Sequence, residues 1–174
     1  MNDIFDNEVI VYSPSIHKDY RGDLWTTYQR GSFKPELDFK HDKYSTSSKG
    51  VLRGLHGDFE TYKLVSCLSG SMYFVVVDNR EDSITYLCWD CMILDDKERK
   101  QVLLPPGFAN GFYVLEGPAL FSYKLNYPES YVDADKQFTL KWNDPALKID
   151  WPDSNPILSE RDKSCENIIT KARA

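Results

Sequence analysis

The chain has 174 residues, and its formal net charge of −6 argues against a general nucleic-acid binder, which needs a basic face. It contains no apolar run of about 18 residues, which excludes a membrane-spanning helix, and its length suits one domain over residues 1–174. The acidic segment Met1–Asp6 lacks the order of a signal peptide, so we expect a cytoplasmic protein.

Short β-type segments separated by turns dominate the chain. The break at Ser69-Gly70-Ser71, between two β-branched and aromatic runs, predicts a β-hairpin. Pro105-Pro106-Gly107 predicts a tight turn. Near the end of the chain, Ser159 is placed to cap a short helix through Arg161 and Ile168. The predicted strands are Val9–Tyr12, Leu24–Tyr28, Tyr62–Leu68, Met72–Asp78, Ser83–Cys91, Gln101–Leu104, Gly111–Leu115 and Ala119–Leu125.

This regular spacing of short strands is typical of a sandwich or barrel. We therefore predict an all-β fold, a β-sandwich with short C-terminal helical segments and no internal repeat or linker.

Cys88-Trp89-Asp90-Cys91 spells the C-x-x-C pattern of redox and zinc sites. It lies in a predicted strand, however, where residues three apart point to opposite faces, and no second cysteine pair completes a zinc site. We interpret both as buried or half-buried thiols.

Arg53 and His56 lie beside glycines in the segment Val51–Asp58, and these glycines permit close backbone approach to a ligand. The arginine fork grips phosphate, so a phosphorylated small molecule is a possible ligand, and histidine is the natural base near neutral pH. A histidine in an apolar β protein is more often structural, however, and the spacing alone leaves both interpretations open.

A metal site is not favoured by the ligand supply. Small β-barrels that bind iron or zinc usually offer two neighbouring histidines and a third on a later strand. His56 has no histidine two residues away, and the later turn Gly107–Gly111 offers the amide of Asn110. We therefore expect no metal.

Four further side chains are ambiguous from the sequence alone. Arg21 either binds a phosphate or is an exposed residue of a turn. Lys63 is costly in an apolar strand unless it is paired, functional or facing solvent. Tyr123 is by default a core residue, and Asp162 is by default a solvated helix residue.

Ordered segments between residues 19 and 162 together carry more information than any single motif. They are Asp19–Gly22, Val51–His56, Lys63–Val65, Gly70–Asp78, Pro105–Phe112, Phe121–Lys124, Trp142–Leu147, Ile149–Pro152 and Leu158–Asp162. In this order and spacing the chain resembles the dTDP-4-dehydrorhamnose 3,5-epimerase family.

The resemblance implies a cupin-like jelly roll with its core at residues 45–128, no metal, and a homodimer in which an N-terminal strand can join the partner's sheet. It also implies four catalytic roles. His56 would be the base, Asp162 would orient it, Tyr123 would be the proton donor, and Lys63 would lie beside the sugar carbonyl.

The remaining implied contacts are with substrate. Arg21 and Arg53 would grip the diphosphate, Asn110 stands where the family usually has a histidine, and His41 is a possible wall of the pocket. The family usually has an acidic residue where Phe74 stands, and a short insertion lies between Lys124 and Trp142.

The implied chemistry suits these residue types. A C4 ketone acidifies the protons on C3 and C5, because removing either gives an enolate with its charge on the C4 oxygen. A neutral imidazole can take such a proton, and an ammonium at the developing oxyanion contributes about 3 kcal/mol. No cofactor is needed, since the ketone is already the electron sink.

Several details are closer to a branch acting on GDP-linked 4-keto heptoses in surface-polysaccharide pathways. They are Lys40–Lys43, Gly54–Asp58, Thr61–Val65, Asn110 and Tyr131–Ala134. We therefore expect an epimerase of a GDP-4-keto-6-deoxy-heptose. The alternatives are a dTDP-4-keto-6-deoxyglucose 3,5-epimerase, a metal-dependent cupin enzyme and a non-catalytic sugar-nucleotide-binding cupin.

Overall fold

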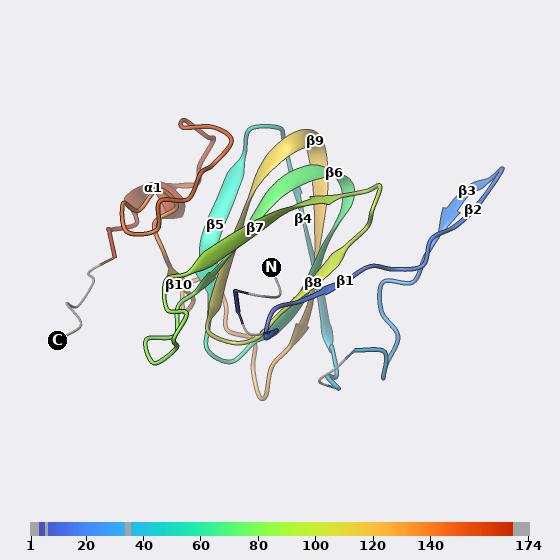
Figure 1. Ribbon diagram of the computed structural model, residues 1–174, viewed down its shortest axis with the longest axis horizontal. Helices are drawn as coiled ribbons and strands as arrows, with labels where there is room; N and C mark the ends of the chain where they lie inside the picture. Colours follow the sequence, from blue (N-terminus) through green and yellow to red (C-terminus); the bar gives the residue numbers. More distant parts are fainter. Residues whose placement is uncertain (1–3, 6, 34–35, 169–174) are drawn as a thin grey trace.

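A computed structural model of the chain describes residues 4–5, 7–33 and 36–168 (Figure 1). Apart from one short helix, α1 (Glu160–Ser164), the regular elements in these ranges are strands. They are β1 (Ile10–Tyr12), β2 (His17–Asp19), β3 (Gly22–Leu24), β4 (His41–Ser47), β5 (Leu52–Gly57), β6 (Tyr62–Asp78), β7 (Trp89–Asp95), β8 (Gln101–Leu104), β9 (Phe108–Asn126) and β10 (Phe138–Thr139).

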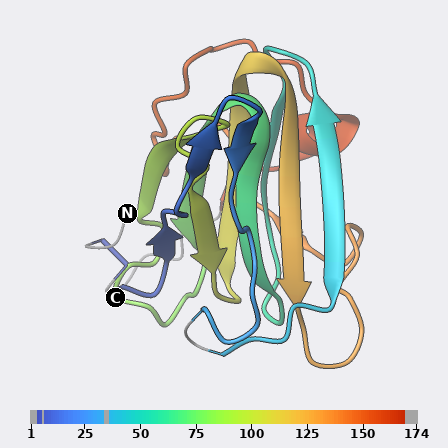
Figure 2. The ribbon, with the colours of Figure 1, turned by 90° about the vertical axis from the view of Figure 1, so that its right-hand side faces the viewer.

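The long strands β6 and β9 bend across two layers and pair with each other in both (Figures 1 and 2). In the first layer the antiparallel order is β1-β8-β6-β9-β4, and in the second it is β7-β6-β9-β5-β10. The two halves of β6 have different neighbours on one side: β8 pairs with the first half, and β7 pairs with the second. This arrangement confirms the predicted all-β, cupin-like jelly roll.

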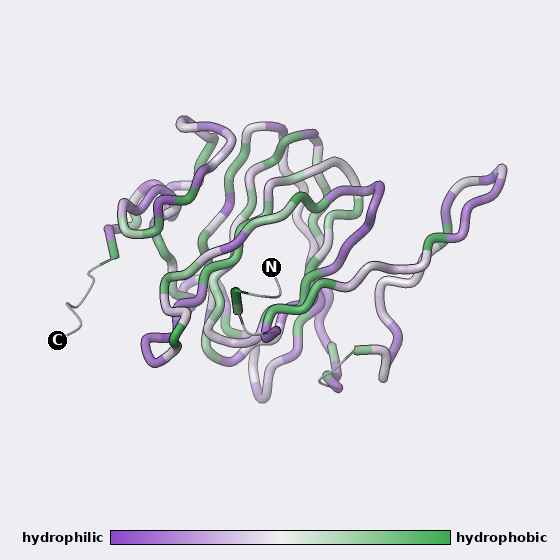
Figure 3. The backbone as a smooth tube through the Cα atoms, in the orientation of Figure 1, coloured by the Kyte–Doolittle hydropathy of each residue, from purple (hydrophilic) through white to green (hydrophobic). Residues whose placement is uncertain are grey.

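The hairpin β2–β3 forms a separate two-stranded sheet that projects from the body at the right of Figure 1. Its tip is mostly hydrophilic, whereas apolar residues concentrate on the strands of the two layers (Figure 3). Within the part of the chain that the structure describes, no helix has the length and apolar character needed to cross a membrane.

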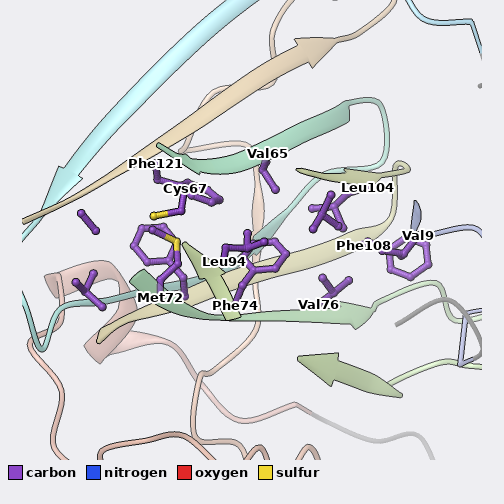
Figure 4. Close-up of a cluster of buried hydrophobic side chains, with 14 of the residues drawn as sticks. Val9, Val65, Cys67, Met72, Phe74, Val76, Leu94, Leu104, Phe108 and Phe121 are labelled. Atoms are coloured by element: carbon purple, nitrogen blue, oxygen red, sulfur yellow. The ribbon is translucent and has the colours of Figure 1, made fainter. Parts of the chain in front are cut away.

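Apolar side chains from both layers meet between the sheets (Figure 4). Alternation along each strand points every second residue inward, which places Val65 and Cys67 from the first half of β6 opposite Phe74 and Val76 from the second. Phe121 lies among these side chains with no exposed surface. Because burying such a side chain stabilises a fold by about 1.5–3 kcal/mol, this cluster is a main source of stability.

Segments outside the two layers cover the outward faces of the sheets. Leu55, Val75 and Val77 pack under Leu140 and Leu147 of the C-terminal segment. On the opposite side, Leu64 and Leu103 pack under Phe33. Both faces of the central strands are therefore apolar, which explains why their sequences show little alternation.

The predicted hairpin at Ser69-Gly70-Ser71 is wrong, because β6 continues through these residues as one strand. Its register against β9 shifts there, as in a β-bulge. Gly70 has a φ of 79°, and a Cβ at this position would lie 2.4 Å from the carbonyl oxygen of Glu116. Glycine thus serves a bulge instead of a turn. Similarly, the two strands predicted between Gly111 and Leu125 are one strand, β9.

Three other boundaries differ from the prediction. The segment Leu24–Tyr28 is not a strand beyond Leu24, and Trp25 there lies under the Arg99 guanidinium. The predicted strand at Ser83 begins only at Trp89, since the Ser83 and Thr85 side chains bond to each other in a turn. The predicted C-terminal helix stops at Ser164.

All four cysteines are free, but the prediction that Cys88 and Cys91 are buried or half-buried holds only for Cys91 and is wrong for Cys88. Cys88 is exposed and precedes β7, while Cys91 is half-buried within that strand.

We predict that Gly70→Ala destabilises the protein more than Gly31→Ala. Both glycines have left-handed φ values, 79° and 81°, but nothing lies within 4 Å of a Cβ built on Gly31. The added methyl at residue 70 must displace β9 backbone, so the difference should be about 1–3 kcal/mol, the usual cost of overpacking. Urea denaturation measures both variants, and equal losses would show that the bulge accepts a side chain.

Candidate active site

A cavity of about 300 Å³ opens between the two layers, beside the apolar core. Every second residue of β6 and β9 points inward, and at the end of the core these inward positions carry polar side chains. Tyr123 lies two residues beyond Phe121 on β9, and Lys63 lies two residues before Val65 on β6. Asn110 of β9 pairs with His56 of β5. Each of these four polar side chains lines the cavity.

The imidazole of His56 is tied to the carboxylate of Asp162. Its Nε2 lies 2.6 Å from Asp162 Oδ1, and Ser159 Oγ donates to Asp162 Oδ2 at 2.8 Å. Ser159 also caps α1 by accepting a hydrogen bond from the Asp162 amide. Asp162 is only 2% exposed, so its interpretation as a solvated helix residue is wrong. Since a carboxylate only accepts, Nε2 carries the proton and Nδ1 keeps its lone pair.

Lys63 is buried at the cavity wall, not solvent-facing. Its Nζ donates to the His56 carbonyl oxygen and to Asn110 Oδ1, both at 3.5 Å, and lies 4.0 Å from Asp58 Oδ2. Burial lowers the pKa of the ammonium from 10.5 to about 8. The negative charge of Asp58 raises this pKa, and the positive charge of Arg161 lowers it further.

Tyr123 projects from the half of β9 that pairs with β4, and its ring packs edge-on against Phe121. Burial raises the pKa of its hydroxyl to about 12, while Ser45 and Arg53 act in the opposite sense. The phenol therefore keeps its proton at neutral pH and is able to donate it.

Of the four predicted substrate contacts, two line the cavity and two do not. Asn110 and Arg53 line the cavity, where Arg53 is exposed and its Nε donates to Ser47 Oγ at 2.9 Å. His41 lies outside the lining and packs against Tyr131. Arg21 does not line the cavity and pairs with Asp19 in the β2–β3 hairpin, which projects from the body (Figure 1).

Several cavity residues were not among the predicted site residues, and Lys43, Tyr131 and Arg161 are three of them. Lys43 alternates with Ser45 on β4, and its Nζ donates to the Tyr131 hydroxyl at 3.3 Å. Tyr131 belongs to the insertion between Lys124 and Trp142. The sequence shows that this insertion exists, but only the fold shows that it reaches the cavity. Arg161 directly precedes Asp162, and its Nε donates to Thr139 Oγ1 at 2.9 Å. The sequence signal for Lys43 is strand alternation, because residues two apart on β4, such as Lys43 and Ser45, point to the same side.

Phe74, where the family usually has an acidic residue, lies in the core and does not line the cavity. Among the described residues, no group of three or more His, Cys, Asp and Glu side chains is placed to hold a metal ion.

Comparisons with known proteins agree on one family. The sequence model described as dTDP-4-dehydrorhamnose 3,5-epimerase matches residues 6–169. A Shigella flexneri protein of that name is 35% identical over 169 residues, which cover 93% of this chain and 92% of the relative. A Legionella pneumophila dTDP-6-deoxy-D-glucose-3,5-epimerase, solved with dTDP-4-keto-L-rhamnose, superposes with a TM-score of 0.86 at 36% identity, over 92% of this chain and 88% of that one.

A 3′-monoepimerase from Streptomyces bikiniensis, solved with dTDP-quinovose, superposes with a TM-score of 0.83 at 28% identity, over 92% of this chain and 83% of that one. These three relatives are named for, or solved with, dTDP-linked sugars. They do not support the expected GDP-heptose substrate, and they favour the dTDP-sugar alternative.

We predict that the neutral imidazole of His56 is the Nε2–H tautomer, because Asp162 accepts from that nitrogen. Long-range ¹H–¹⁵N correlation spectra distinguish the two ring nitrogens. Asp162→Asn should disturb the His56 tautomer and leave the spectrum of His17, which lies on β2, unchanged. A wild-type His56 protonated at Nδ1 would contradict the assignment.

Proposed function

The chain belongs to the dTDP-4-dehydrorhamnose 3,5-epimerase family, as the sequence resemblance implied, and we propose that it inverts C3, C5 or both of a dTDP-linked 4-keto-6-deoxy sugar. It is an isomerase that acts on nucleotide-linked 4-keto sugars. The nucleotide is assigned from the names of the relatives, and the reacting groups are assigned from the cavity.

One observation carries the assignment of the reacting groups. His56 comes from β5 in the second layer, whereas Tyr123 comes from the part of β9 that pairs with β4 in the first. Both line the same cavity, so the base and the acid project from facing layers. Inversion requires removal of a proton from one face of the ring and delivery to the other, and two facing walls meet this requirement.

The proposed reaction begins at His56. Its free Nδ1 takes a proton from the carbon beside the ketone, and Asp162 stabilises the imidazolium that forms. The electron pair moves to the C4 oxygen, and the Lys63 ammonium stabilises that charge by about 3 kcal/mol. Tyr123 then returns a proton to the opposite face of the same carbon, which restores the ketone.

The diphosphate would lie at the exposed end of the cavity beside Arg53, whose guanidinium suits phosphate. Arg21, the other predicted phosphate contact, lies in the β2–β3 hairpin, which projects from the body of its own chain (Figure 1), and it does not line the cavity. We therefore propose a homodimer in which the β2–β3 hairpin of one copy brings Arg21 to the cavity of the other.

The proton-transfer roles predict a specific pattern of solvent deuterium exchange. With dTDP-4-keto-6-deoxyglucose in heavy water, we expect deuterium at C3, C5 or both, located by NMR. His56→Ala should abolish the exchange, and Tyr123→Phe should slow it by about 100-fold or more. Tyr113→Phe is the matched control, because Tyr113 lies on β9 but outside the cavity.

Wild-type exchange in His56→Ala would reject the base assignment. The corresponding GDP-linked 4-keto hexose and heptose are run beside the dTDP sugar, and faster turnover of a GDP sugar would overturn the nucleotide assignment.

The dimer proposal predicts complementation between two inactive variants. Arg21→Ala damages the hairpin, whereas His56→Ala damages the cavity, so a mixed dimer contains one intact site. Co-expression of the two should restore epimerase activity. Co-expression of His56→Ala with Tyr123→Phe should not, because both lesions lie in the cavity. No recovery in the first pair would mean that Arg21 does not act across the dimer.

A further inference from the structure

Asp58 lies in the turn between β5 and β6 and is only 4% exposed. Its Oδ1 accepts the backbone N–H groups of Glu60 and Thr61 at 3.0 and 2.7 Å, which closes the turn. Its Oδ2 is buried and has no hydrogen-bond partner among the described residues. The turn uses one oxygen, so it does not account for a buried carboxylate charge at this position.

The group that faces this second oxygen is the ammonium of Lys63, at 4.0 Å. The two other oxygens near Lys63 Nζ, from the His56 carbonyl and Asn110, are uncharged. Asp58 is therefore the anion beside this buried cation. It does not line the cavity, whereas Lys63 does.

The other charged or titratable groups around Lys63 do not replace Asp58. Arg161 of α1 is cationic and disfavours a second positive charge. His56 and Tyr123 line the same cavity, and the carboxylate of Asp162 is already bonded to His56 and Ser159. A buried ammonium with no anion beside it tends to lose its proton, because burial penalises the charged form.

We propose that Asp58 is a positioning residue of the active site, whose carboxylate keeps the buried Lys63 side chain charged and directed at the cavity. The value of this charge for catalysis rests on the proposed function, in which Lys63 stabilises the enolate oxygen. The electrostatic pairing itself does not depend on the substrate.

Asp58→Asn tests the pairing with little change of shape. The Asn carbonyl still accepts the N–H groups of the turn, while the charge is removed. Asp95→Asn is a matched control, because Asp95 Oδ1 closes the turn after β7 in the same way, accepting from Lys97 and Glu98 at 3.0 and 2.8 Å, and does not line the cavity.

The titration of the Lys63 amine is measured without substrate, by competitive acetylation with acetic anhydride across pH and peptide mass spectrometry. In the wild type the amine should titrate near its pKa of about 8. Asp58→Asn should lower this pKa by about one unit or more, since it removes the compensating charge, and Asp95→Asn should leave it unchanged. A folded Asp58→Asn protein with the wild-type titration overturns the proposal.

Activity supplies a second measurement. Because the ammonium is the active form, the alkaline limb of kcat/KM should move to lower pH in Asp58→Asn, with the smallest loss of activity on the acidic side. A loss equal at every pH would indicate a structural role only and overturns the proposal. If no 4-keto sugar is epimerised, the proposed function fails, whereas the acetylation titration still decides the pairing.

A double-mutant cycle keeps the test decisive if Asp58→Asn alone does not fold. Lys63→Met should destabilise the protein by leaving the Asp58 carboxylate buried and uncompensated. Adding Asp58→Asn to that variant should recover part of the lost stability in urea denaturation. A double variant less stable than Lys63→Met contradicts the pairing.

Discussion

Desolvation of ionisable groups inside an apolar sandwich is the constraint on which the chemistry of this protein depends. Burial disfavours charge on any group, so it lowers the pKa of an amine and raises the pKa of a phenol. The ordinary pKa values of Lys63 and Tyr123 are 10.5 and 10.0, and in the cavity they become about 8 and about 12. The phenol is thereby kept as a proton donor, while the amine stays charged only with the help of a neighbouring carboxylate.

The bent strands β6 and β9 explain how one apolar interior accommodates such a site. Both strands run through both layers, and their inward positions change from apolar to polar within two residues, from Val65 to Lys63 and from Phe121 to Tyr123. The core and the cavity therefore share the same strands. The packed core thus holds the strands that carry Lys63 and Tyr123, and His56 and Tyr123 come from facing layers.

Local sequence patterns predicted the fold class and several strands, and the ordered motifs identified His56, Lys63 and Tyr123, which the structure brings to one cavity. Other features depended on long-range contacts. A Gly-containing break is compatible with a turn or a bulge, and only pairing of β6 with β9 across Gly70 decides between them. Asp162 looked like a surface residue because its partner lies 106 positions earlier in the chain.

Ser159 links the C-terminal segment to this site, because it both caps α1 and bonds the Asp162 carboxylate. A helix of five residues is too short to persist alone in water, so α1 owes its existence to docking against the sandwich. During synthesis on the ribosome, the jelly-roll strands emerge well before residue 162 does. His56 therefore gains the Asp162 carboxylate as a partner only after every strand of the jelly roll has been synthesised.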